Sequence, residues 1–227
     1  MRLKSRIEWL SLISLFGSLQ FIIITFIAMP FYPGGTYIDS NVSGYSFFFN
    51  YFSDLGMTVS YSHENNLISF VLFSITLSIF ALSYLLFFIN AVFIFKENKL
   101  EKILSVFGLI FAGLSAISSI GAAFTPLDLY FDEHNLFAGG VFLWALFPFI
   151  TYSIVIYLNK KYSKKFSIPF IIVVILLIGI IIANFLGPSN QTPEGLLLQV
   201  TLQKIILYFW CISLAVGSFK NLKIEHT

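Results

Sequence analysis

Residues 168–186 read IPFIIVVILLIGIIIANFL, a run without a single charged side chain. A helix of about 20 apolar residues spans the hydrocarbon core of a bilayer, so this stretch predicts a transmembrane helix. Apart from Asn184 the run is almost wholly aliphatic, which favours a peripheral position against lipid. Five other runs are long and apolar enough to span in the same way: Trp9–Met29, Asn66–Phe95, Ile103–Phe124, Asn135–Leu158 and Val200–Phe219. The sequence therefore predicts an all-α integral membrane protein, with residues 1–227 forming a single bundle of six transmembrane helices.

The composition excludes other classes of protein. Hydrophobic residues make up 58% of the chain and charged residues only 11%, against roughly 25% charged in soluble proteins. A soluble fold could not cover that much apolar surface with polar groups. The net charge of +2 gives no reason to expect nucleic-acid binding. Cys211 is the one cysteine, so neither an intrachain disulfide nor a cysteine-based zinc site can form.

The basic residues predict the orientation. Cytoplasmic loops of membrane proteins retain lysine and arginine. If the six spans are correct, 12 of the 13 basic residues fall on one face of the membrane: Arg2, Lys4, Arg6, Lys96, Lys99, Lys102, Lys160, Lys161, Lys164, Lys165, Lys220 and Lys223. We therefore expect a cell-membrane protein with both termini in the cytoplasm. No small-residue cleavage pattern follows Met29, which indicates that the first helix is retained rather than removed as a signal peptide.

The first outer loop, Pro30–Asn65, is the longest connection. It opens with the turn signal Pro33-Gly34-Gly35 and continues with an aromatic stretch from Tyr45 to Gly56 that is too short to span. Aromatic rings are favoured at the membrane–water interface, so this stretch predicts a partly interfacial or re-entrant segment. We expect it to fold over the outer mouth of the bundle.

The candidate site residues gather at the same face. Asp54, in Ser-Asp-Leu-Gly, is either a functional carboxylate or an ordinary turn residue whose carboxylate bonds nearby N–H groups. Asp128 precedes the fourth helix, where an acidic residue can cap free N–H groups. Lys204 lies about one turn inside the sixth helix, close to Gln199 and Gln203. It is either a functional charge with an acidic partner or a lysine that snorkels to the interface.

Two histidines suggest a metal site. His63 precedes the second helix and His134 opens the fourth, at the same predicted depth. Together with Asp54 or Asp128 they would supply the ligands of a zinc ion with an open position for activated water. The competing interpretation is an interfacial histidine bonded to a carboxylate, because these residues share no diagnostic spacing.

Short motifs carry a family resemblance. Ser53-Asp54-Leu55-Gly56 follows the first helix, Glu64 stands before the second, and His134-Asn135 opens the fourth. This order resembles the six-helix DRAM/FRAG group (damage-regulated autophagy modulators and relatives) and a related prokaryotic membrane family of unknown function. The likeness covers roughly residues 9–158. It implies a six-helix bundle, membrane lipid as a partner and no established reaction.

Two functional classes remain after transport is set aside, because few ionisable groups lie at the helix centres. The first is a non-enzymatic, lipid-associated or regulatory bundle whose outer polar groups hold the first loop in place. The alternative is an outer-leaflet, metal-assisted lipid hydrolase or transferase that uses His63, His134 and Asp54 or Asp128. The sequons at Asn41 and Asn190 are outer glycosylation sites or chance matches.

Overall fold

The structure, a computed structural model, describes residues 3–160 and 162–223. Arg2 and Lys161, two of the basic residues used to predict the orientation, lie outside the described residues. Within the described ranges, six helices are long and apolar enough to cross a membrane, which confirms the predicted fold class. They are α1 (Leu3–Ala28), α2 (Leu67–Ile94), α3 (Lys99–Phe124), α4 (Phe131–Leu158), α5 (Ile168–Leu186) and α6 (Pro193–Leu222).

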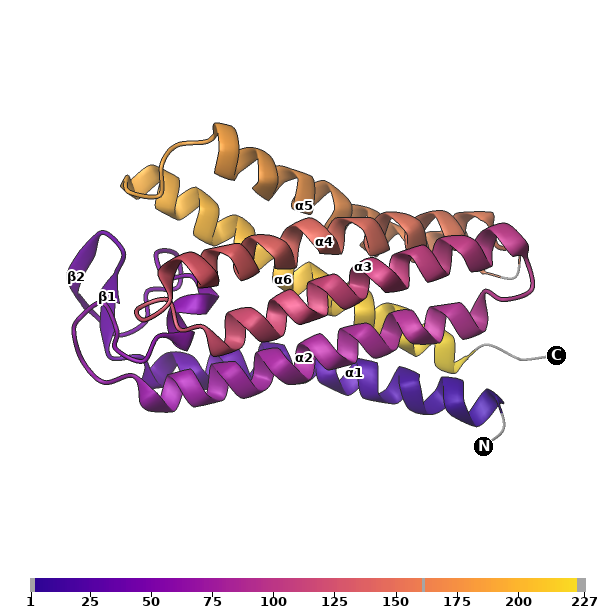
Figure 1. Ribbon diagram of the computed structural model, residues 1–227, viewed down its shortest axis with the longest axis horizontal. Helices are drawn as coiled ribbons and strands as arrows, with labels where there is room; N and C mark the ends of the chain where they lie inside the picture. Colours follow the sequence, from indigo (N-terminus) through magenta and orange to yellow (C-terminus); the bar gives the residue numbers. More distant parts are fainter. Residues whose placement is uncertain (1–2, 161, 224–227) are drawn as a thin grey trace.

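The helices form a closed ring. Each helix packs against the next one in sequence, and α6 packs back against α1. The bundle is elongated, with the start of α1 and the end of α6 at one extremity and the strands β1 (Gly34–Thr36) and β2 (Asp39–Ser43) at the other (Figure 1). We call the first extremity the lysine end, because it holds the basic connections α2–α3 and α4–α5, and the second the hairpin end.

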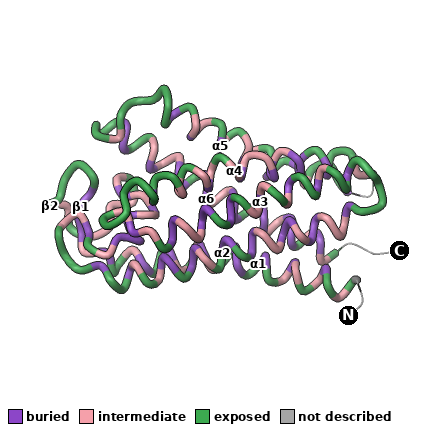
Figure 2. The backbone as a smooth tube through the Cα atoms, in the orientation of Figure 1, coloured by how far each residue is buried: buried purple, intermediate pink, exposed green. Residues whose placement is uncertain are grey.

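An aromatic core fills the middle of the ring. The ring of Trp210 lies 4.9 Å from Tyr84, 5.2 Å from Phe149 and 5.8 Å from Phe80, measured between centroids. These side chains come from α2, α4 and α6, and all are buried. Buried positions follow the inner faces of the helices along the bundle (Figure 2). The core therefore ties together helices that are far apart in sequence.

Small residues bring α3 close to its neighbours. Ser115, Ser119 and Ala123, one helical turn apart, are all buried. The Ser115 hydroxyl donates to the Val141 carbonyl oxygen of α4 at 2.9 Å, and the Ser74 hydroxyl of α2 donates to the Ala123 carbonyl oxygen at 2.8 Å. Small side chains allow this close backbone approach, which is how helices associate in lipid.

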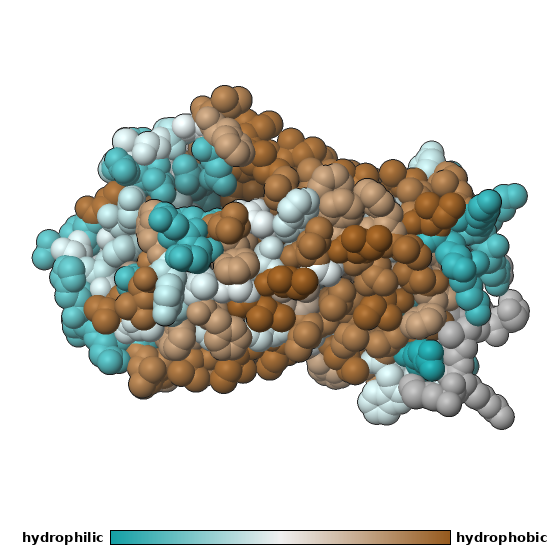
Figure 3. All heavy atoms as spheres, viewed as in Figure 1, coloured by the Kyte–Doolittle hydropathy of each residue, from teal (hydrophilic) through white to brown (hydrophobic). Residues whose placement is uncertain are grey.

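On the face seen in Figure 3, an apolar belt lies between two polar ends of the bundle. Side chains such as Phe16, Ile117 and Ile175 are each more than 60% exposed on it. An apolar surface of this extent needs a non-aqueous environment, which supports a multi-pass membrane protein. α5 contributes heavily to the belt because it packs only one face, against α4 and α6. The predicted peripheral position of this helix agrees with that packing.

Four helices, α1, α3, α4 and α6, begin before the predicted apolar runs. α6 begins at Pro193 rather than Val200, and α4 begins at Phe131 rather than Asn135. The hydroxyl of Thr192 caps α6 by accepting the Gly195 N–H at 3.2 Å. Hydropathy detects only the part of a helix inside the hydrocarbon core, so polar first turns that project toward the headgroups are missed.

Candidate functional site at the hairpin end

The first loop folds into a small antiparallel hairpin, which the sequence analysis did not predict. Gly34 pairs with Ser43, and Thr36 pairs with Asp39. Gly35 has a φ of 81°, and a β-carbon there would lie 2.5 Å from the Ser62 backbone nitrogen. Only glycine tolerates this conformation and this contact. The Pro33-Gly34-Gly35 turn signal therefore marks the place where the hairpin lies against the end of the same loop.

The aromatic stretch of the loop ends in a buried 3₁₀ turn, η2 (Phe52–Gly56), that packs on the bundle. Asp54 lies within it and is fully buried. Its Oδ2 accepts the Tyr51 backbone N–H at 2.9 Å and the Asn50 side-chain amide at 3.0 Å. These are the contacts of a structural turn residue, because the carboxyl bonds its own loop and does not line a cavity.

Lys204 lies beneath this turn. Its side chain is only 2% exposed, so it does not snorkel to the interface. The ammonium donates to the Asn50 carbonyl oxygen and lies about 5 Å from the ring centres of Tyr45, Phe47 and Phe52. Cation–π attraction and the carbonyl dipole thus take the place of water. The lysine holds the loop to α6.

Asn50 connects the two buried ionisable groups. Its backbone carbonyl oxygen accepts a hydrogen bond from the Lys204 ammonium, while its side-chain amide donates one to the Asp54 carboxylate. Burial raises the pKa of Asp54 to about 7, while the Asn50 amide, the Lys204 charge and the Tyr51 N–H each favour the carboxylate. Gln203, next to Lys204, adds a third tie by accepting the Phe52 N–H at 2.8 Å. We call Asn50, Asp54, Gln203 and Lys204 the loop anchor.

Asp128 ties the same loop to the α3–α4 connection. Its carboxylate accepts the backbone N–H of Thr58 at 2.9 Å, that of Val59 at 3.0 Å, and the Thr58 hydroxyl. The sequence left a helix-capping role open for Asp128. Asp128 instead binds N–H groups of a segment 70 residues away, because the loop folds back over the helix ends.

His134 is held at the end of α3. Its Nδ1 lies 2.7 Å from the Thr125 carbonyl oxygen, and the side chain is 3% exposed. A carbonyl oxygen can only accept, so Nδ1 carries the proton. The expected carboxylate partner is therefore replaced by a backbone group at a helix C-terminus, where carbonyl oxygens lack helical partners.

The two histidines have different environments. His63 is exposed in a turn, with a φ of 64°, whereas His134 is buried between α3 and α4. Across residues 3–160 and 162–223, no three histidine, cysteine or acidic side chains are grouped so that they could hold a metal ion. The structure thus gives no support to the predicted zinc-ligand set of His63, His134, Asp54 and Asp128, because the last three are each bound to a different part of the backbone.

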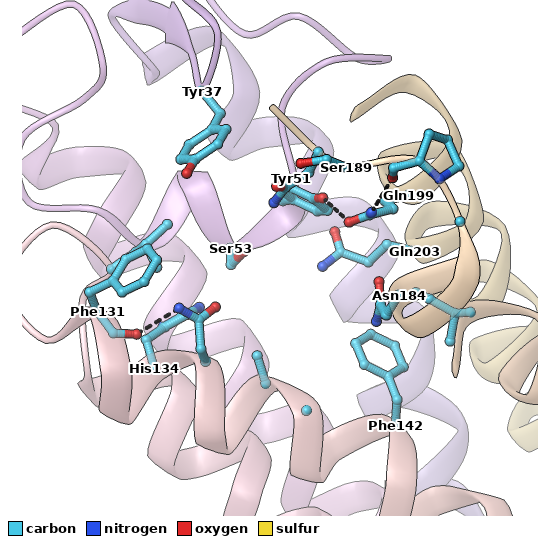
Figure 4. Close-up of a pocket in the computed structure, with 18 of the residues that line it drawn as sticks. Tyr37, Tyr51, Ser53, Phe131, His134, Phe142, Asn184, Ser189, Gln199 and Gln203 are labelled. Carbon is cyan, nitrogen blue, oxygen red and sulfur yellow. Dashed lines mark hydrogen bonds between the residues drawn. The ribbon is translucent and has the colours of Figure 1, made fainter. Parts of the chain in front are cut away.

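A cavity of about 550 Å³ opens beside the loop anchor. It lies between the first loop, the α5–α6 connection and the ends of α4, α5 and α6, where α5 diverges from α4 (Figure 1). Phe131 and His134 stand on one wall, and Asn184, Gln199 and Gln203 on the other (Figure 4). The volume falls in the range of roughly 300–1,000 Å³ that is typical of ligand sites.

The cavity lining is polar toward the loop and apolar toward the membrane belt. Phe142 and Ile180 line the deeper part, whereas Asn184, exposed near the hairpin end of α5, lies one turn closer to the loop than Ile180. The Gln199 amide is fixed at both ends, since its Oε1 accepts the Tyr51 hydroxyl at 2.9 Å and its Nε2 donates to the Pro188 carbonyl oxygen at 3.1 Å. Such a lining suits a molecule with a polar head and an apolar body.

The cavity was not predicted from the sequence, although the sequence contains a signal for it. Asn184 interrupts an otherwise aliphatic run, and Gln199 and Gln203 enter α6 four residues apart. Uncharged polar residues on neighbouring membrane helices point to a shared polar space. Of the predicted candidates only His134 lines the cavity, together with Asn190 of the second sequon.

Comparison with known proteins finds no matching family model, no significantly similar curated protein and no significantly similar solved structure. The DRAM/FRAG resemblance therefore stays a prediction that rests on the motifs around Asp54 and His134.

Proposed function

We propose that the protein is a non-enzymatic cell-membrane protein that binds a lipid headgroup in the cavity at the hairpin end. The observation that carries this proposal is the cavity itself, which joins a polar rim to an apolar floor beside the membrane belt. A lipid has the same division between a polar head and apolar chains. Asn184 of the lining is followed in α5 by Phe185 and Leu186, which are each 83% exposed, so the site lies next to the surface that would face lipid.

The ionisable groups support binding rather than chemistry. Asp54 and Lys204 hold the first loop to α6, Asp128 holds it to the α3–α4 connection, and His134 binds the end of α3. A catalytic group must reach the reacting atoms, but three of these four residues do not line the cavity. Their shared role is to keep the wall of the cavity in place.

The proposal also assigns the hairpin end to the outer leaflet. The described basic residues in the connections and at the chain ends lie at the lysine end, and cytoplasmic segments retain basic residues. Two isosteric substitutions at exposed positions, Ser40→Cys at the hairpin end and Ser163→Cys at the lysine end, test the assignment. Cys211 is buried and gives little background. A membrane-impermeant maleimide should label Ser40→Cys in intact cells and Ser163→Cys only after permeabilisation; the opposite pattern would invert the assignment.

Blocking the cavity tests the binding function. A β-carbon at Gly139 meets no other atom within 4 Å, so Gly139→Trp should place an indole in the cavity without moving the backbone. We expect native mass spectrometry of the purified variant to show at least a tenfold loss of co-purified lipid. Gly113→Trp on α3 is the matched control, because a β-carbon there also meets open space and Gly113 does not line the cavity. Equal lipid retention by both variants would refute lipid binding at this site.

A further inference from the structure

The cavity lining carries no formal charge. Among its 19 residues, all in the described part of the chain, there is no aspartate, glutamate, lysine or arginine. The nearby charges of Asp54 and Lys204 are buried in the loop anchor and do not line it. A phosphate brought into such a space would lose its water without gaining a cation. The lining therefore disfavours an anionic headgroup.

The polar groups that remain suit hydroxyl groups. The Oε1 of Gln203 is occupied by the Phe52 N–H at 2.8 Å, which leaves the two N–H groups of its amide as donors. Figure 4 shows the Gln203 and Asn184 side chains near one another on the same wall. A hydroxyl group both donates and accepts, as an amide does, so a headgroup with several hydroxyl groups can pair with these side chains without a charge on either partner.

Aromatic rings complete the polar rim. Tyr37 and Tyr61 meet edge to face, with ring centroids 6.1 Å apart, and both line the cavity with Tyr51. Ring faces pack well against the C–H groups of a sugar ring, which is apolar on its faces and polar at its edges. Phe142 and Ile180, apolar side chains of the lining that lie closer to the middle of the bundle, would meet the glycerol and the start of the acyl chains.

From these observations we infer that the ligand is a lipid with an uncharged, hydroxyl-rich headgroup, of the class of glycosyl diacylglycerols. This inference rests on the proposed function, because it names the lipid class for the same cavity. The determining features are an uncharged amide wall, a tyrosine rim and an apolar floor that adjoins the membrane belt.

The test compares lipids with identical acyl chains. Purified wild-type protein in detergent is titrated with monoglucosyl diacylglycerol, phosphatidylglycerol, unmodified diacylglycerol and methyl glucoside, and binding is measured by native mass spectrometry. We expect the glycosyl lipid to bind at least tenfold more tightly than each of the other three. Tighter binding of phosphatidylglycerol or of diacylglycerol would overturn the inference, and so would equal binding of methyl glucoside, which carries the sugar without a lipid.

Substitutions connect the preference to the cavity. Gln203→Glu keeps an acceptor for the Phe52 N–H but replaces the amide donors with a charged oxygen, and should weaken glycosyl-lipid binding about tenfold. Gln191→Glu makes the same chemical change at an exposed position outside the lining, and should leave binding unchanged. Asn184→Leu, at the exposed edge of α5, is a second cavity substitution in case Gln203→Glu does not fold. We expect it to weaken glycosyl-lipid binding about fivefold. Binding unaffected by either cavity substitution would overturn the inference.

Lipid binding in the cavity and the class of the headgroup can be disproved separately. If phosphatidylglycerol binds more tightly and Gly139→Trp abolishes that binding, the headgroup class is wrong and lipid binding stands. If no lipid distinguishes the wild type from Gly139→Trp, both are wrong.

Discussion

The middle of the bundle and the hairpin end fill the space between the helices in opposite ways. In the middle, Trp210, Tyr84 and Phe149 pack ring against ring and close the space between α2, α4 and α6. At the hairpin end α5 leaves α4, and the gap is walled by a folded loop that hydrogen bonds and buried charges hold down (Figure 1). Aromatic packing needs no exact partner and excludes any ligand, whereas a polar wall needs specific partners and leaves room for one. Three substitutions sharpen this contrast.

The largest loss of stability from one substitution at a fixed pH is expected in the aromatic core. Trp210→Ala removes the largest fully buried side chain. We expect the free energy of unfolding to fall by about 3 kcal/mol. This value is at the low end for such truncations, because lipid can replace some of the lost contacts. Tyr37→Ala, at the cavity rim, should change it by less than about 0.5 kcal/mol. Unfolding of both variants by sodium dodecyl sulfate in mixed micelles measures the difference. Similar losses would mean that the two regions do not differ as described.

A pH-dependent effect is expected at the loop anchor. Burial raises the pKa of Asp54 from 3.8 to about 7, so between these values the folded protein binds a proton that the unfolded chain has released. Its contribution to stability is therefore complete below about pH 4 and is lost as the pH rises through 7, by at most about 1.4 kcal/mol per pH unit. Asp54→Asn should abolish this slope in unfolding curves recorded between pH 4.5 and 7.

Glu194→Gln, an exposed acidic residue in the first turn of α6, serves as the control for Asp54→Asn and should keep the slope. If the asparagine variant retains the full slope, another group is responsible and Asp54 is not the proton-binding residue of the anchor.

The smallest effect is expected where the loop meets the α3–α4 connection. Asp128→Asn retains one acceptor oxygen but loses the charge and one of the bonds to Thr58 and Val59, at a cost of about 1 kcal/mol. Limited proteolysis in detergent should cut the loop several-fold faster, while global unfolding shifts little. Asp132→Asn, in the exposed first turn of α4, is the control. Unchanged proteolysis would show that the anchor alone holds the loop.

The sequence predicts the part of the fold that depends on local composition. The six spans follow from the length of each apolar run, and the peripheral position of α5 follows from its almost wholly aliphatic composition. The hairpin end was less predictable, because its contacts join residues far apart in the chain, such as Phe52 with Gln203 and Thr58 with Asp128. The sequence pointed to Asp54 through its motif and to Lys204 through its position inside a span, but it did not predict that Asn50 would connect them.

The central claim is that the cavity holds a selected lipid, and photo-crosslinking tests it directly. The photoreactive residue p-benzoylphenylalanine is placed at Phe142 on the cavity floor and, as a reference for bulk lipid, at Leu143, which is 44% exposed on the membrane belt. After irradiation in native membranes, mass spectrometry identifies the attached lipids. We predict that Phe142 captures one lipid class strongly enriched over the mixture captured at Leu143. The same mixture at both positions, or protein crosslinks alone at Phe142, would contradict the claim.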